Sequence, residues 1–165
     1  KHQGKLDEAI KVFKKTVLLK PYHTNAYHNM ANTLRDQGKL GESVIACKKA
    51  LSLKPDYSEA YSNLANTFHE MGKLDEAEAN YVQAIALKPN FSEALYNLSI
   101  NRSYMNNLEA EIHAWKSILK IDTDDYGLRA GVHLAIHKFL EGDLKESKKK
   151  VLAAEKIHEK TLSKY

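Results

Sequence analysis

The sequence predicts an all-α fold, an α-solenoid built from antiparallel helix pairs. Two observations predict it. First, helix-breaking residues recur with a period of 34. They are Pro21, Pro55 and Pro89 together with Gly4, Gly38 and Gly72. Second, the apolar residues between them follow the three-and-four spacing of amphipathic helices. A unit of this length holds two helices that bury their apolar faces against neighbouring units, so the repeat predicts a stack.

The unit over residues 24–57 illustrates each element. Its first helix starts at Thr24 and places apolar residues on one face, at Ala26, Tyr27, Met30, Ala31 and Leu34. Gly38 ends that helix, because glycine readily adopts the left-handed conformation that closes a helix C-terminus. A second helix follows, and Pro55 stops it because proline lacks the amide donor and clashes with the preceding turn. We expect Ser58 and Ser92 to cap the first helices of the next two units.

These positions resemble the signature of the tetratricopeptide repeat family. In the unit after Pro55 the signature positions hold Tyr61, Leu64, Ala65, Phe68, Ala77, Tyr81, Ala84 and Pro89. The preceding unit has Tyr27, Met30, Ala31, Leu34, Ser43, Cys47, Ala50 and Pro55 at the same places. The resemblance implies a right-handed superhelix of about nine helices, with the first helix of each pair on the concave side. Its small residues would let paired helices approach closely.

The repeat divides the chain into five parts. Residues 1–23 supply the second helix of a truncated unit, and residues 24–57 and 58–91 are regular units. Residues 92–125 form a degenerate unit, in which Glu111 replaces the usual small residue and Thr123 the proline. Residues 126–165 form a divergent pair that ends in a long helix from Leu144 to about Ser163. A polar last helix is what a stack needs to end in solvent.

On the family pattern, the exposed side chains of the first helices line a peptide-binding face. The predicted site residues are Asn25, His28, Asn29, Asn32, Arg35, Glu59, Asn63, Asn66, His69, Glu93, Tyr96 and Asn97. A carboxylate clamp, as in the chaperone adaptors of the family, is not expected. His28, Glu93 and Asn97 stand where that clamp has Lys and Arg.

Asparagine recurs on this face with the period of the repeat. Asn29, Asn63 and Asn97 are 34 apart, and Asn32 and Asn66 follow the first two by three residues. A carboxamide both donates and accepts hydrogen bonds, so a ladder of them matches a peptide backbone. The pattern resembles the asparagine ladder of the O-linked N-acetylglucosamine transferases. The alternative is that these amides bond to adjacent helices and only stabilise the stack.

The sequence contains no catalytic constellation, and we expect neither enzymatic activity nor a cofactor. His133, His137 and Glu141 share a helix face and could in principle ligate zinc. That helix is rich in Leu and Ile, where histidines are ordinary, so we expect no metal site. Cys47 stands at an aromatic core position, which favours a buried thiol over a nucleophile.

The leading hypothesis is therefore a protein–protein interaction scaffold that binds an extended peptide or a partner protein. The alternative is the substrate-recruiting region of a larger glycosyl-, sulfo- or methyltransferase. The net charge of +4 is modest and scattered, so neither nucleic acid nor a membrane is expected as a partner. Apolar residues along Leu6–Leu19 would permit a homodimer. The sequence opens mid-pattern, and we expect a piece of a longer, cytoplasmic protein.

Overall fold

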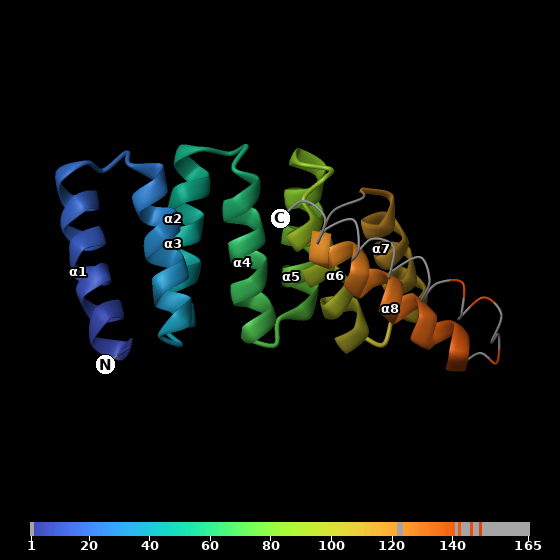
Figure 1. The fold of residues 1–165 in the computed structure, drawn as a ribbon. Helices are drawn as coiled ribbons and strands as arrows, with labels where there is room; N and C mark the ends of the chain where they lie inside the picture. Colours follow the sequence, from blue (N-terminus) through green and yellow to red (C-terminus); the bar gives the residue numbers. More distant parts are fainter. Residues whose placement is uncertain (1, 122–123, 141, 143–145, 147–148, 150–165) are drawn as a thin grey trace. The chain divides into compact units, whose positions relative to one another are not determined.

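The computed structural model describes residues 2–121, 124–140, 142, 146 and 149 (Figure 1). These residues form helices and no strand, which confirms the all-α prediction. The helices are α1 (His2–Leu19), α2 (Thr24–Asp36), α3 (Leu40–Leu53), α4 (Ser58–Glu70), α5 (Leu74–Leu87), α6 (Ser92–Tyr104), α7 (Leu108–Ile121) and α8 (Asp124–Leu140). The last helix predicted from the sequence, starting at Leu144, lies outside the described residues.

The chain comprises two compact units, Lys1–Pro89 and Asn90–Tyr165. In the first unit α2 packs against both α1 and α3, and α4 packs against both α3 and α5 (Figure 1). The first helices α2 and α4 also touch each other, whereas the backbones of α1 and α3 do not come close together. In the second unit α7 packs against α6 and α8.

Left-handed residues close the first helix of each pair. Gly38 and Gly72 both have φ of 73°, and Asn106 takes the corresponding place in the second unit with φ of 55°. After Gly38 the backbone N–H of Lys39 donates to the carbonyl of Leu34 at 2.9 Å, which satisfies a carbonyl at the helix end. Asparagine is among the few residues besides glycine that accept this conformation, so the same turn forms at Asn106 without a glycine.

The prediction that Ser58 and Ser92 cap α4 and α6 is wrong. Tyr57 and Phe91 occupy the N-cap positions, and neither makes a side-chain capping hydrogen bond. The two serines are the first residues inside their helices, and the hydroxyl of Ser58 donates to Glu59 Oε2 at 2.9 Å. The helices therefore start one residue earlier than a serine cap requires.

Small residues lie at the closest helix contacts of the first unit. Ala31, Ala65 and Ala77 are at most 1% exposed, so the paired helices meet nearly backbone to backbone. A polar link runs through this core. Ser43 Oγ on α3 donates to the carbonyl oxygen of Ala31 on α2 at 2.9 Å and lies 3.1 Å from Thr67 Oγ1 on α4. The hydroxyl of Thr67 also lies 2.8 Å from the carbonyl oxygen of Asn63.

The second unit accommodates Glu111 by hydrogen bonding. This carboxylate is 6% exposed, and its Oε1 accepts a 3.2 Å hydrogen bond from Trp115 Nε1. The same oxygen lies 3.5 Å from His137 Nε2, and His133 stacks on the Trp115 ring at 4.3 Å between centroids. A buried carboxylate is tolerated where its lone pairs are satisfied. The two histidines considered as zinc ligands thus face Glu111 and Trp115, and Glu141 lies outside the described residues.

Candidate functional site

The polar faces of α2 and α4 form the candidate site of the first unit. Helix spacing of three and four places the predicted residues of α2 along one face, and the same holds for α4. Because α2 and α4 contact each other, the two faces adjoin. Asn29 is exposed, while His28, Asn32, Arg35, Asn63, Asn66 and His69 are half-buried.

Asn63 and His28 join the two helices. The amide nitrogen of Asn63 lies 3.2 Å from Nδ1 and 3.3 Å from Nε2 of the His28 ring. The His28 ring also stacks on Tyr57, with centroids 5.0 Å apart, and the Tyr57 hydroxyl lies 3.5 Å from Asn25 Oδ1. Amide, imidazole and phenol groups therefore form a continuous polar strip from α4 to the start of α2.

Burial lowers the pKa of His28, against the smaller opposing influence of the Glu59 carboxylate. The ring is accordingly neutral at pH 7, since an unperturbed histidine is already mostly neutral there. A neutral ring has an unprotonated nitrogen that can accept a hydrogen bond from the Asn63 amide. The His28 ring therefore offers hydrogen bonds rather than positive charge.

Charged side chains on the two helices are paired with opposite charges. Arg35 Nε lies 3.4 Å from Glu70 Oε1, and its Nη2 lies 3.6 Å from Asp36 Oδ1. Glu59 Oε1 lies 3.2 Å from Lys88 Nζ. Burial acts to raise the pKa of Glu59, but hydrogen bonds from its backbone amide and from Ser58, together with Lys88, leave that pKa lowered overall. The charges on this face therefore compensate one another.

The asparagines of the ladder have different environments. Asn66 Oδ1 accepts a 2.6 Å hydrogen bond from the hydroxyl of Tyr81, a side chain that is 2% exposed. Asn32 Oδ1 is enclosed and has no hydrogen-bond partner among the described residues. Asn29 is exposed. Asn66 therefore matches the stabilising alternative, whereas Asn29 is an exposed residue of the same polar face.

The predicted site residues of the second unit lie on α6. Glu93 is exposed and Asn97 is half-buried. Tyr96 packs edge-on against Trp115 at 5.4 Å and lies 5.5 Å from the Tyr126 ring, while the guanidinium of Arg129 sits 5.5 Å above it. Tyr96 is thus part of the packing of α6 against α7 and α8.

Sequence reasoning missed Tyr57, Lys54 and Lys88. Tyr57 stacks on His28, and Lys54 Nζ lies 5.0 Å from the centroid of the Tyr57 ring. A signal existed, because His23, Tyr57 and Phe91 are 34 apart and place a ring directly before each first helix. The pairing of Lys88 with Glu59 had no comparable signal.

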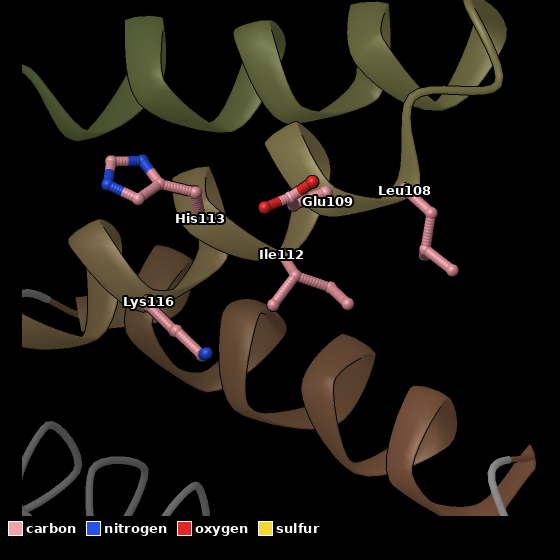
Figure 2. Close-up of a pocket in the computed structure, with 5 residues that line it drawn as sticks. All are labelled: Leu108, Glu109, Ile112, His113 and Lys116. Carbon is pink, nitrogen blue, oxygen red and sulfur yellow. The ribbon is translucent and has the colours of Figure 1, made fainter.

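The second unit also has a surface pocket on α7. Its volume is about 550 Å³, and its described lining residues are Leu108, Glu109, Ile112, His113 and Lys116. Figure 2 shows these side chains projecting from successive turns of that one helix.

The described residues contain no cluster of three or more side chains suited to a metal ion. None of their helices is long and apolar enough to cross a membrane.

Repeated helix pairs of this geometry define a class of helical-repeat proteins. The family model for the tetratricopeptide repeat matches residues 22–90. The first tetratricopeptide repeat domain of Spaghetti (RPAP3), solved bound to the HSP90 peptide SRMEEVD, has 30% identity and a TM-score of 0.61, and the match covers 64% of this chain and 83% of that one. The chain belongs to the tetratricopeptide repeat family.

Longer structural matches share the fold over nearly the whole chain. A crystal structure of MamA gives a TM-score of 0.81 with 24% identity, covering 99% of this chain and 94% of that one. MamA 41-end from Desulfovibrio magneticus RS-1 gives 0.75 with 17% identity, covering 94% and 87%. At identities below 25%, these structural matches establish a shared fold alone. A comparison with curated protein sequences gave no significant match.

Proposed function

We propose that the chain is a protein-interaction scaffold, and that the polar face of α2 and α4 binds an extended peptide segment of its partner. The polar strip through Asn63, His28, Tyr57 and Asn25 carries this proposal. It presents neutral donors and acceptors in a row, which suits the amides of an extended backbone. The peptide complex of the Spaghetti domain supports a peptide as the class of ligand.

The charges favour an internal peptide segment over a free C-terminal carboxylate. Capture of a carboxylate needs an available cation, but Arg35 is paired with Glu70 and Asp36. His28 is held neutral by burial. The binding energy would therefore come from hydrogen bonds to the peptide backbone, with little demand on side-chain charge.

The ladder of Asn29, Asn63 and Asn97 remains part of the proposal, with its likeness to the O-linked N-acetylglucosamine transferases. Asn29 and Asn63 belong to the first unit and Asn97 to the second. Nothing in the comparisons supports the alternative of a recruiting region in a larger transferase.

Homodimerisation through the first helix is a separate proposal. Leu18 and Leu19 on α1 are 79% and 71% exposed, and Tyr22 directly after the helix is 84% exposed. A surface of this kind favours self-association when it is contiguous. Sedimentation of the chain over a range of concentrations tests the proposal, and a monomer at every concentration would rule it out.

Peptide selection tests the proposed binding face. Peptides selected from a displayed library on the folded chain should bind Asn29→Ala and Asn63→Ala about tenfold more weakly, as expected for the loss of one well-formed hydrogen bond. Asn80→Ala is the matched control, because Asn80 lies on α5 and bonds to its own backbone at Glu76. Equal binding by all three variants would overturn the proposal.

The same peptides distinguish the two modes of capture. Synthetic versions with a free and with an amidated C-terminus should bind with equal affinity if an internal segment is recognised. A strict requirement for the free carboxylate would show instead that the site is a carboxylate clamp.

A further inference from the structure

The first unit has a second surface, on the side away from the polar face of α2. A pocket of about 380 Å³ opens there between α1 and α3. Its lining residues are Lys14 from α1, Tyr27, Met30 and Leu34 from α2, and Glu42, Ile45, Ala46 and Lys49 from α3. The backbones of α1 and α3 do not come close to each other, and α2 supplies Tyr27, Met30 and Leu34 to the lining between them.

The floor of this pocket is apolar and its edge is charged. Met30, Leu34 and Ala46 are buried at the base, whereas Ile45 at the mouth is 70% exposed. An aliphatic side chain this exposed beside an apolar pocket is a surface that a partner could bury favourably. Lys14 and Glu42 stand on opposite helices with 3.8 Å between Nζ and Oε2, and their side chains are 60% and 52% exposed. An exposed ion pair of this kind contributes little to the stability of the fold, and either side chain can readily form an ion pair with a partner instead.

Lysines predominate around the pocket. Lys11 lies one turn from Lys14 on α1, and Lys48 lies one turn from Ile45 on α3. Both are exposed, as are Lys15 and Lys49. The acidic residue that lines the pocket is Glu42, so the rim carries an excess of positive charge.

The repeat shows that the fold does not require these residues. One period later the equivalents of Ile45, Ala46 and Lys49 are Ala79, Asn80 and Gln83. One period earlier Lys11 takes the place of Ile45. The exposed isoleucine with its neighbouring lysine therefore belongs to this one hairpin, beyond what packing demands.

We infer that this pocket is a docking site for an acidic amphipathic helix of a partner protein. A groove between two helices accepts a third helix, whose apolar side chains are spaced at three and four residues. One such side chain would enter the pocket beside Ile45. Carboxylates flanking it would face Lys14 and Lys49, and this charge complementarity selects an acidic partner. The site is independent of the peptide-binding face on the other side of α2.

A synthetic peptide serves as the probe. It combines leucines at helical spacing with glutamates elsewhere, and a second peptide of equal composition has the leucines scrambled. Fluorescence anisotropy should show tighter binding of the first peptide. Ile45→Ala should weaken that binding about tenfold, the effect of losing one buried aliphatic contact. Lys49→Gln should weaken it roughly threefold and flatten its dependence on salt.

Both substitutions copy residues that the next repeat carries, so the fold should be retained. Val82→Ala on α5 is the control, because it removes a similarly small apolar side chain that is 42% exposed elsewhere in the same unit. This variant should bind like the original chain, and library-selected peptides should bind Ile45→Ala unchanged. Equal binding of ordered and scrambled peptides, or no effect of Ile45→Ala, would overturn the inference.

Two other outcomes would also overturn it. If a single-stranded RNA oligonucleotide binds and the acidic peptide does not, the lysines form a general polyanion surface. If the chain sediments as a dimer that Ile45→Ala dissociates, the occupant is a second copy.

Discussion

Asn66 provides the sharpest test of which asparagines stabilise the stack. Its Oδ1 accepts a 2.6 Å hydrogen bond from the hydroxyl of Tyr81, which is almost fully buried. Asn66→Ala removes this acceptor and leaves the Tyr81 hydroxyl to find another partner in the core. By contrast, Asn29 is exposed on the preceding first helix. Both residues are asparagines on the polar face of a first helix, so Asn29 serves as the exposed comparison.

The expected magnitude follows from two opposing contributions. An unsatisfied buried hydroxyl costs about 2 kcal/mol. Replacing Asn by Ala in a helix gains about 0.6 kcal/mol. Asn66→Ala should therefore destabilise by about 1.4 kcal/mol, which lowers the Tm of a chain of this size by about 3–6 °C. Asn29→Ala has only the gain, so its Tm should stay the same or rise by about 2 °C.

Thermal unfolding followed by circular dichroism measures both variants. Tyr81→Phe completes a double-mutant cycle, because the hydrogen bond is absent in all variants that lack either partner. The double variant should be destabilised by about 1 kcal/mol less than the sum of the single variants. If Asn66→Ala melts at the same temperature as Asn29→Ala, or if the cycle shows no coupling, the hydrogen bond does not stabilise the fold and Asn66 would be available for a ligand.

Three further predictions concern buried or half-buried polar groups. Glu111→Ala should destabilise by about 1–3 kcal/mol because it leaves the indole N–H of Trp115 unpaired, whereas Glu111→Gln keeps an acceptor and should cost less; urea unfolding of the two variants compares them. Because the pKa of His28 is lowered in the folded chain, the unfolded state binds the proton first as the pH falls below 6.5, and the free energy of unfolding decreases on acidification. Urea unfolding at pH 7.5 and 5.5 should show that this decrease is smaller in His28→Gln. Burial raises the pKa of the Cys47 thiol to about 12, so a thiol reagent at pH 8 should modify the folded chain far more slowly than the urea-unfolded chain, and equal rates would contradict the burial.

The sequence predicted the fold through local rules. A period of 34, glycines at helix ends and prolines after second helices are signals within a few residues, and the helices of the first unit follow them. The prediction of a cap at Ser58 failed because α4 begins at Ser58 itself, which leaves Tyr57 at the N-cap position. Asn106 could have been predicted to take the glycine's place, since it is in register with Gly38 and Gly72.

The contacts of the candidate site were less accessible to sequence reasoning. The stacking of His28 on Tyr57 depends on the angle at which one helix pair follows the next, which no short pattern specifies. The hydrogen bond between Asn66 and Tyr81 depends on which of two faces a half-buried amide turns towards. Likewise, the contacts of the buried Glu111 carboxylate include His137 on α8, a helix that the 34-residue pattern does not describe. Periodicity identified the residues on the face but not their partners.

The hydroxyl link through Ser43 and Thr67 restricts the movement of α2 relative to α4 in the chain without a ligand. Ser43 donates to the main chain of α2 at Ala31, and its oxygen can accept the hydroxyl proton of Thr67 on α4, so hydrogen bonds inside the core join the two helices through α3. A rotation of one first helix against the other would break these bonds in a dry environment, where no water replaces them. The spacing of the two helices is therefore set before any guest chain binds, and association would lose less conformational entropy than it would on a surface that must first be ordered.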